Sequence, residues 1–203
     1  MFIPANYKVE NPQEAIDFMK KYSFATVVST DTDGEPVASH IPLTISQSGD
    51  DIALNGHFAK ANTQWQTLED KKVLVIFNEP HAYISPSKYD KFESVPTWNY
   101  IAVHAYGTCK LIQDEEQAFE LLNAMILTYE PAYKTQWDAI AEDYKNRMIK
   151  GIVTFRISVT DIRASKKLSQ NKTPEERERI IDRLSNSADS LEKEIARYMQ
   201  QLR

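Results

Sequence analysis

Strand-like segments that follow one another through short turns dominate the N-terminal half of the chain. Phe24–Thr30 has the apolar and β-branched residues of a strand, Asp33-Gly34 is a strong hairpin signal, and Pro36–Ile45 supplies the returning strand. A further short strand is predicted at 51–56, and Lys72–Phe77 is a continuous apolar strand that must lie in the core. Strands joined by turns this short pair antiparallel. So many of them favour a sheet that closes into a barrel and leaves no exposed edges.

Helix signals surround these strands. Capping residues, apolar spacing and a terminal proline or glycine predict helices at about 12–22, 62–69, 114–130 and 136–150. Asn11 and Asn62 are the expected caps of the first two, and Pro131 and Gly151 end the last two. One more strand, Ile152–Val159, follows. The prediction is an α+β domain over 1–165 with a helical insertion at about 114–150.

A helical extension is predicted for 166–203. Thr173 to Glu176 is a capping box with Pro174 at the first helical position. Apolar residues then recur at alternating three- and four-residue steps as far as Leu202, a seam of the coiled-coil kind that the polar stretch 185–187 can split into two helices. The seam can dock on the chain's own barrel or on a second subunit, and the sequence leaves both open.

Charge and cysteine content limit the classes of partner. The net charge of −5 argues against a dominant nucleic-acid or membrane surface. Cys109 is the only cysteine, which rules out an intramolecular disulfide and fits a reducing cytoplasm. Its strand-like surroundings favour a buried small side chain rather than a nucleophile. No leader-like start and no apolar run long enough to span a bilayer are present, so we expect a soluble cytoplasmic protein.

The stretch 81–107 contains a candidate ligand site. Two strand-like segments there flank an aromatic and polar turn region. The turn region brings together hydrogen-bonding groups and flat apolar surface, and this arrangement suits a planar polar ligand. The residues that supply them are Ser85, Thr97, Trp98 and Asn99. The alternative is a well-packed surface loop with Trp98 filling the core.

The stretch 56–65 passes from a strand end to a helix start, where backbone N–H groups are free to bind an anion. Lys60 is a candidate phosphate ligand there, with His57 as a second donor, although lysine is common at strand ends. The basic, amide-rich run 165–172 can reach a ligand phosphate or a nucleic acid, or can be a solvated connector.

Other site chemistries lack their sequence patterns. The four histidines have no metal-ligand spacing, so no metal site is expected. No nucleophile elbow or glycine-rich phosphate loop occurs. With five glycines in the chain, a nucleotide would have to be held by side chains and strand edges.

Six ordered motifs of the chain match those of one family. They are FIPANY, residues 38–43 in the pattern A-x-H-x-P-L, GHFAKANTQW, AYISPSKY, VPTWNY with Val103 and Gly107 following, and KLSQNK. On these motifs the chain resembles the FMN-binding negative transcriptional regulator family over nearly its whole length. Lys88 stands where that family usually has tryptophan, which removes an aromatic surface. Lys60 stands for the usual arginine and keeps the charge.

The resemblance implies an antiparallel Greek-key split barrel that binds FMN and forms a homodimer with flavin sites at the subunit interface. It places Ala38, Ser39, His40 and Ile41 along the isoalloxazine ring. It assigns the phosphate to His57, Ala59 and Lys60. Ser85, Thr97, Trp98 and Asn99 would complete the pocket from the same or the other subunit. The same reasoning extends to Lys167, Ser169, Gln170 and Asn171.

The function that the resemblance implies is negative regulation of transcription, of the kind that represses protease synthesis and sporulation. It can act on DNA directly or through flavin or metabolite chemistry. The acidic body and the lack of a helix-turn-helix pattern argue against direct DNA binding, and only the helix around Arg177, Arg179 and Arg183 comes close to a recognition helix. The alternatives are an FMN-dependent oxidoreductase acting on a small molecule, in which no catalytic side chain need be visible, and a haem-binding barrel, which would need an axial histidine.

Overall fold

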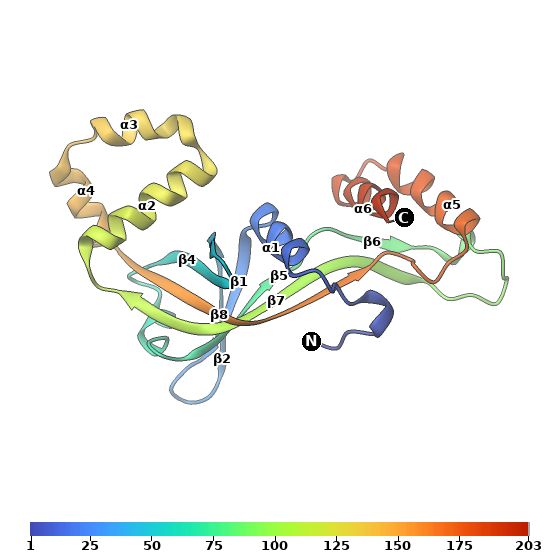
Figure 1. Cartoon of the computed structure of the whole chain (residues 1–203), viewed down its shortest axis with the longest axis horizontal. Helices are drawn as coiled ribbons and strands as arrows, with labels where there is room; N and C mark the ends of the chain where they lie inside the picture. The colour runs from blue at the N-terminus through green and yellow to red at the C-terminus, as the bar shows by residue number, and fades with distance from the viewer. Residues whose placement is uncertain (203) are drawn as a thin grey trace. The chain divides into compact units, whose positions relative to one another are not determined.

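The computed structural model describes residues 1–202, which form two compact units (Figure 1). The first unit contains Met1–Ala15, Asn78–His104 and the chain from Arg163 on, and the second contains Ile16–Phe77 and Ala105–Ile162. The helices are α1 (Pro12–Lys21), α2 (Glu115–Tyr129), α3 (Lys134–Ala139), α4 (Glu142–Ile149), α5 (Pro174–Ser185) and α6 (Ser190–Gln201). The strands are β1 (Phe24–Thr30), β2 (Pro36–Pro42), β3 (Thr44–Ser48), β4 (Asp51–Ala59), β5 (Lys72–Phe77), β6 (His81–Ile84), β7 (Thr97–Ile112) and β8 (Ile152–Lys167). Short 3-10 helices are η1 (Ala5–Tyr7), η2 (Thr63–Thr67), η3 (Pro86–Lys88) and η4 (Pro131–Tyr133).

The strands form one sheet in the order β2-β1-β5-β7-β8-β4-β3, with β6 beside β7. The ladders β1–β2, β1–β5, β3–β4, β4–β8 and β6–β7 are antiparallel. The predicted α+β class with an antiparallel sheet is therefore confirmed. Gly34, in the predicted turn between β1 and β2, has φ +84°, a conformation that glycine adopts at little cost.

The prediction of a closed sheet is wrong. Within residues 1–202, β2 and β3 are the two ends of the strand order, and no ladder joins them. These strands are consecutive in the chain and were predicted as one strand, Pro36–Ile45. Leu43 lies between them: its N–H donates to the Ser23 carbonyl (2.9 Å), which continues the β1–β2 pairing by one residue, and from Thr44 on the chain pairs with β4 instead. A single buried residue thus links the two edges of the sheet covalently.

The core of the second unit is built by alternation along its strands. Every second residue of β1 and β5 is buried, as expected for strands with one face against a core. Phe58 of β4 and Phe155 of β8 are buried there with ring centroids 4.9 Å apart. Gly56 is the partner of Phe155 in the β4–β8 ladder, and a Cβ atom there would lie 2.8 Å from Leu43 Cδ2 and 3.1 Å from Phe155 Cζ. Glycine at position 56 therefore allows the side chains of Leu43 and Phe155 to pack directly against the backbone of β4.

Two strands are longer than predicted. β7 has 16 residues and continues through Gly107 to Ile112, beyond the stretch 81–107 in which strand-like segments were identified. A Cβ atom at position 107 would lie 2.6 Å from Ile157 Cγ2 and closer still to the Ser158 carbonyl oxygen. Glycine at this position therefore allows β7 and β8 to lie close together. β8 also has 16 residues and extends to Lys167, which makes the first part of the expected loop at 165–172 a strand.

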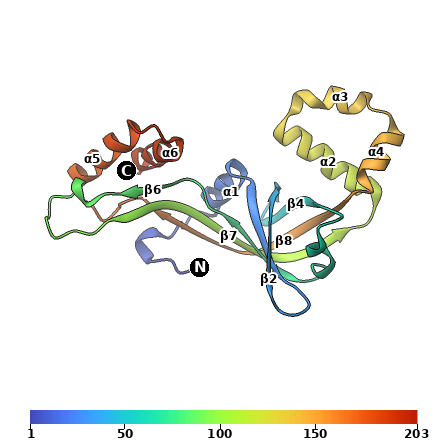
Figure 2. The ribbon, with the colours of Figure 1, turned by 180° about the vertical axis from the view of Figure 1, so that it is seen from behind.

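The helical insertion differs from the prediction in one place. α2 begins after Asp114, whose carboxylate accepts a hydrogen bond from the Gln117 N–H (2.8 Å), and Pro131 follows its end as expected. The helix expected at 136–150 is instead divided into α3 and α4, because Ile140 and Ala141 both have extended backbone angles. Figure 2 shows α2, α3 and α4 following one another around a loop of helices.

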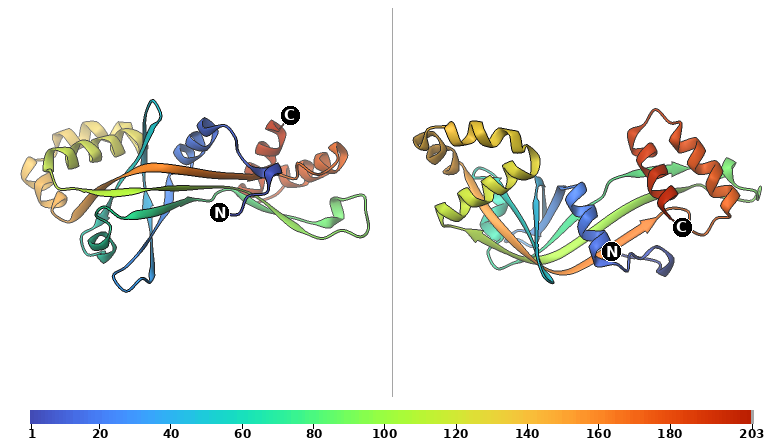
Figure 3. Two further views of the ribbon diagram at one scale, coloured as in Figure 1. Left: turned by 60° about the horizontal axis from the view of Figure 1, so that its bottom comes forward. Right: turned by 45° about the horizontal axis from the view of Figure 1, so that its top comes forward.

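In the first unit, α5 and α6 pack together and α6 lies on β6 (Figure 3). The predicted capping box is present, with Thr173 Oγ1 accepting from the Glu176 N–H and the Glu176 carboxylate accepting from the Thr173 N–H. The apolar side chains of these helices that are buried are Ile180, Leu184, Ile195, Ala196 and Met199, and of these only Leu184 and Ile195 belong to the predicted seam. The two helices are separate, as the polar stretch 185–187 suggested.

No helix in residues 1–202 combines the length and the apolar character that crossing a membrane would require.

Candidate functional site

The residues predicted to hold a cofactor divide between the two units. The second unit contains Ala38, Ser39, His40, Ile41, His57, Ala59 and Lys60. The first unit contains Ser85, Thr97, Trp98, Asn99, Lys167, Ser169, Gln170 and Asn171.

In the second unit, β1, β2 and β5 expose one side, which we call the open face. It consists of Phe24, Thr26, Val28, Ala38, His40, Leu74 and Ile76, which lie beside one another in the ladders. Phe24 is 70% exposed, and Val28, Leu74 and Ile76 are only half-buried. Thr26 Oγ1 and His40 Nδ1 are hydrogen-bonded at 3.0 Å. The open face is thus mostly apolar, with few polar groups.

Strand alternation separates the predicted stretch 38–41. Ala38 and His40 are exposed on the open face. Ile41 is buried in the core, and Ser39 Oγ accepts a hydrogen bond from Asn62 Nδ2 (2.8 Å). Asn62 also caps η2, as predicted, by accepting from the Gln64 N–H. Ala38 and His40 are therefore the members of this stretch that can face a ligand on the open side.

His57 lies on β4 opposite Thr154 of β8. Its Nδ1 atom is buried and has no hydrogen-bond partner among the described residues. Burial lowers the pKa of His57 below its ordinary value of 6.5, because a charged imidazolium would lose hydration. At neutral pH the ring is therefore neutral, and its buried nitrogen still lacks a partner.

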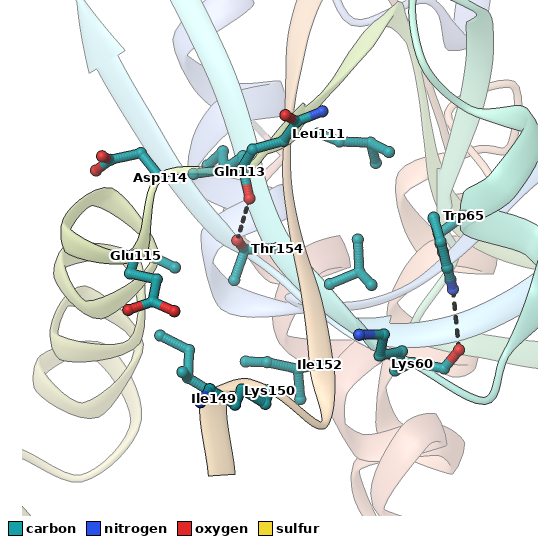
Figure 4. A pocket seen from close by; sticks show the side chains of 13 residues that line it. Lys60, Trp65, Leu111, Gln113, Asp114, Glu115, Ile149, Lys150, Ile152 and Thr154 are labelled. Carbon is teal, nitrogen blue, oxygen red and sulfur yellow. Dashed lines mark hydrogen bonds between the residues drawn. The ribbon is translucent and has the colours of Figure 1, made fainter. Parts of the chain in front are cut away.

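Lys60 follows the end of β4 and lines a cavity of about 350 Å³, which we call the Lys60 cavity (Figure 4). The Lys60 N–H donates to the Gly151 carbonyl (2.8 Å), and its carbonyl accepts from Trp65 Nε1 (3.0 Å). Both backbone groups are thus fixed, so the side chain starts from a defined position. Figure 4 shows the Lys60 amino group and the Glu115 carboxylate on opposite sides of this space.

The Lys60 cavity carries charges of both signs. Lys60 and Lys150 supply two ammonium groups, and Asp114 and Glu115 supply two carboxylates. The Asp114 carboxylate is engaged in capping α2. Among residues 1–202, neither lysine forms an ion pair, which leaves both able to bind an anion. Trp65 lies in the predicted stretch 56–65, whereas Thr154 and Lys150 were not identified from the sequence, because only the fold brings β8 and the end of α4 to the end of β4.

In the first unit, the predicted residues form two hydrogen-bonded pairs. Asn99 is fully buried; its Nδ2 donates to Ser169 Oγ (3.0 Å), and Ser169 Oγ is 3.1 Å from Asn99 Oδ1. The Lys167 ammonium donates to Thr97 Oγ1 and lies 5.8 Å from the centre of the Tyr7 ring. Both pairs join β7 to the segment at the end of β8.

Trp98 lies on the opposite side of β7 from Asn99 and is 51% exposed. The reading in which Trp98 fills the core is therefore wrong. Its ring meets His81 and Tyr83 of β6 edge to face, at centroid distances of 5.5 and 5.9 Å. These three side chains form an exposed aromatic cluster, a surface suited to flat groups.

The loop between β6 and β7 is anchored at its base. Ser85 Oγ caps η3 by accepting from the Ser87 N–H (3.2 Å). Arg179 Nη2 donates to the Asp90 carboxylate and its Nε to the Lys88 carbonyl, while Glu176 accepts from the Asp90 N–H. The hydrogen bonds to the Lys88 carbonyl and to Asp90 fix this loop to α5.

Gln170 and Asn171 complete the predicted set. Gln170 Oε1 accepts from the Leu168 N–H (2.7 Å), and its Nε2 donates to the Lys166 carbonyl. Asn171 is exposed. Gln170 therefore stabilises the turn after β8, and its amide is engaged in that turn.

Within residues 1–202, no group of three or more His, Cys, Asp or Glu side chains converges in a way that could hold a metal ion. Cys109 is buried as predicted, and burial, with a smaller contribution from Glu69, raises its pKa to about 12. Its thiol is therefore protonated and unreactive at neutral pH.

Comparison with protein families shows that residues 1–161 match the family described as "Putative FMN-binding domain". The chain is 41% identical over 203 residues to "Protease synthase and sporulation protein PAI 2" of Bacillus subtilis (strain 168), an alignment that covers 98% of this chain and 97% of that protein.

Two solved structures show the fold. The FAD and heme binding protein from Mycobacterium smegmatis superposes with a TM-score of 0.59 and 15% identity, over 79% of this chain and 73% of that chain. The flavocytochrome Anf3 from Azotobacter vinelandii has a TM-score of 0.58 and 17% identity, over 79% and 69% of the two chains. At these identities the likeness extends to the fold, which is that of flavin-binding split-barrel proteins.

Proposed function

The chain belongs to the "Putative FMN-binding domain" family, and we propose that it is an FMN-binding protein that acts as a homodimer in negative transcriptional regulation. The observation that carries the proposal is the alignment with the Bacillus subtilis protein, which covers nearly all of both chains. The name of that relative points to the control of protease synthesis and sporulation as the regulated processes.

The open face supports a flavin. An isoalloxazine ring is flat and apolar over most of its area, with polar atoms on its edge. The open face offers exposed and half-buried apolar side chains together with His40 and Thr26 as hydrogen-bonding groups. Ala38 lies next to them and is small enough to let a flat ring approach the strand. We assign the ring to Ala38 and His40.

The phosphate is assigned to the end of β4. His57 Nδ1 is a buried nitrogen without a partner among the described residues, and such an atom gains from a ligand that bonds to it. Lys60 adds an unpaired ammonium group at the strand end, and Ala59 precedes it with an exposed position. These groups fit an anionic oxygen ligand. The remaining predicted residues, Ser39, Ile41 and those of the first unit, stay predictions.

FMN, when bound, supplies one- and two-electron transfer chemistry. The chain would bind and orient it. Binding and orienting FMN requires no proton transfer by the assigned residues. The redox state of the bound flavin, or a metabolite that reacts with it, can then be the signal that controls transcription.

The arginines of α5 support regulation without direct DNA contact. Arg177 donates to the carbonyls of Met199 and Leu202, Arg179 binds Asp90, and Arg183 binds Glu192. All three side chains of the candidate recognition helix are thus engaged within the first unit. Base readout needs side chains free to enter a groove. We therefore propose that the regulation acts through the flavin or a metabolite.

Titration of the purified protein with FMN tests the proposal. We expect uptake of about one FMN per subunit, followed by absorbance or flavin fluorescence. Lys60→Ala should weaken binding by roughly 1.5–3 kcal/mol, the cost of a lost charge-assisted contact. Lys72→Ala is the matched control, because Lys72 is exposed at the start of β5 and outside the Lys60 cavity.

Protein that binds no FMN at any concentration would contradict the proposal. Rapid stoichiometric oxidation of a nicotinamide by the flavin-loaded protein would instead favour the oxidoreductase reading. Uptake of haem in place of FMN would favour the haem-binding one.

A further inference from the structure

The second unit contains another cavity, of about 550 Å³, between α2 and the strands β3, β4 and β8. Its size falls within the usual range for small-molecule sites, roughly 300–1,000 Å³. No residue assigned above to FMN lines it, and we call it the Arg156 cavity.

Arg156 is held in this cavity by a buried amide. Asn55 lies opposite Arg156 in the β4–β8 ladder and is 7% exposed. Its Oδ1 accepts from Arg156 Nε (2.9 Å), and its Nδ2 donates to Ser46 Oγ (3.2 Å). Because the amide is fixed at both ends, the guanidinium has a defined orientation. Its Nη groups remain for another acceptor, since Arg156 forms no ion pair within residues 1–202.

Glu120 of α2 lines the same cavity. Its carboxylate also lacks an ion pair in the described part of the chain, and it does not come within ion-pair distance of Arg156. Two unpaired charges of opposite sign thus share one hollow without neutralising each other. A ligand that carries both charges, held apart by its own covalent frame, would bind them together.

Besides the two opposite charges, the cavity lining indicates that the ligand has an apolar part. Ile45, Ile112, Leu121 and Ala124 contribute apolar surface from β3, β7 and α2. Polar side chains also line the cavity, those of Thr44, Ser46, Gln117 and Thr128 among them. Apolar surface together with placed polar groups is found in sites for small organic molecules.

We propose that the Arg156 cavity binds a free amino acid with an apolar side chain. Arg156 binds its carboxylate, Glu120 binds its ammonium group, and the side chain packs against Ile112 and Leu121. The ligand joins α2 to the sheet, because it contacts the helix through Glu120 and β8 through Arg156.

Calorimetric titration of the full-length protein tests this assignment. Each apolar L-amino acid is tested singly, and L-leucine is compared with 4-methylpentanoate, which lacks the amino group, and with 3-methylbutan-1-amine, which lacks the carboxylate. We expect saturable binding of at least one amino acid. Each deletion analogue should bind about tenfold more weakly or worse, because each loses one charge-assisted contact.

Variants locate the binding. Arg156→Gln and Glu120→Gln should each weaken it about tenfold or more. Arg147→Gln on α4 and Glu116→Gln on α2 are matched controls outside the cavity and should leave it unchanged. Glu120 is exposed on its helix, so its variant keeps the test valid if Arg156→Gln fails to fold. Lys60→Ala should also retain the binding, which separates this site from the FMN site.

Two results would overturn the proposal. One is the absence of saturable binding for every apolar amino acid. The other is equal binding of L-leucine and either deletion analogue, which would show that one of the two charges has no role.

Discussion

His57 illustrates how one buried residue can make stability depend on pH. Its pKa in the folded protein lies below 6.5 because the ring is buried. As the pH falls below 6.5, the His57 ring therefore binds a proton more readily in the unfolded chain than in the folded protein. The free energy of unfolding should therefore be greatest above pH 6.5 and should fall as the pH drops below it. Urea denaturation on both sides of pH 6.5 measures this fall.

The His57→Gln variant isolates the contribution. Burial also lowers the pKa of His104, so some of the fall should persist. His81→Gln, which changes an exposed ring on β6, is the control and should leave the wild-type pH profile intact. A His57→Gln profile that coincides with the wild-type one would show that the ring can be charged in the folded protein.

The sequence predicted the positions of candidate residues along the chain better than the side of the strand to which each side chain points. Trp98 and Asn99 were both assigned to a ligand surface, yet adjacent strand residues point to opposite sides. Which side is covered depends on α6, whose Met199 sulfur accepts from Asn99 Nδ2 although the two residues are 100 positions apart. The Asn55–Arg156 pair was missed for the same reason, since 101 positions separate its members.

At the scale of elements, Gly107 decides whether β7 and β8 can lie side by side. An alanine Cβ there would meet Ile157 Cγ2 at 2.6 Å and, closer still, the Ser158 carbonyl oxygen, which belongs to the backbone and cannot turn away. We expect Gly107→Ala to destabilise the protein by about 3 kcal/mol, at or above the upper end for overpacking. Thermal or urea unfolding monitored by circular dichroism gives the value.

Gly56→Ala is the informative comparison. Its Cβ would meet Leu43 Cδ2 at 2.8 Å, which is the flexible end of a side chain. It should therefore cost about 1–2 kcal/mol. If Gly56→Ala proves the more damaging of the two, the backbone of β8 must be able to shift away from β7.

The elements that the sequence predicted well have local causes. β1 and β5 have the predicted bounds because composition and turn residues mark both ends. α1 begins at Pro12 and α5 at Pro174, each following its predicted cap. The errors have non-local causes. The predicted strand Pro36–Ile45 is divided because β2 pairs with β1 whereas β3 pairs with β4, and β7 and β8 are longer than predicted where they lie beside each other in the sheet.

For the whole molecule, the open face is our candidate for the proposed dimer contact. It presents Phe24 at 70% exposure beside half-buried Val28, Leu74 and Ile76, an apolar surface that a second subunit would remove from water. Phe24→Lys should shift the protein toward monomer in light scattering coupled to gel filtration. Phe92→Lys changes the fully exposed aromatic of the β6–β7 loop and should leave the mass as in the wild type. Equal masses for wild type and Phe24→Lys would place the contact elsewhere.

The first unit is assembled from three separate stretches of chain, so the order of translation limits when it can fold. The N-terminal stretch is bound late in the sequence: the Val9 N–H donates to the Ala164 carbonyl (3.0 Å), and Lys8 forms a β-bridge with Ser165. All residues of the second unit lie between these two pairing segments in the sequence, so Lys8 and Val9 are synthesised well before their partners. We expect the first unit to acquire these native contacts only after the whole second unit has been translated, which leaves residues 8 and 9 accessible to chaperones until then.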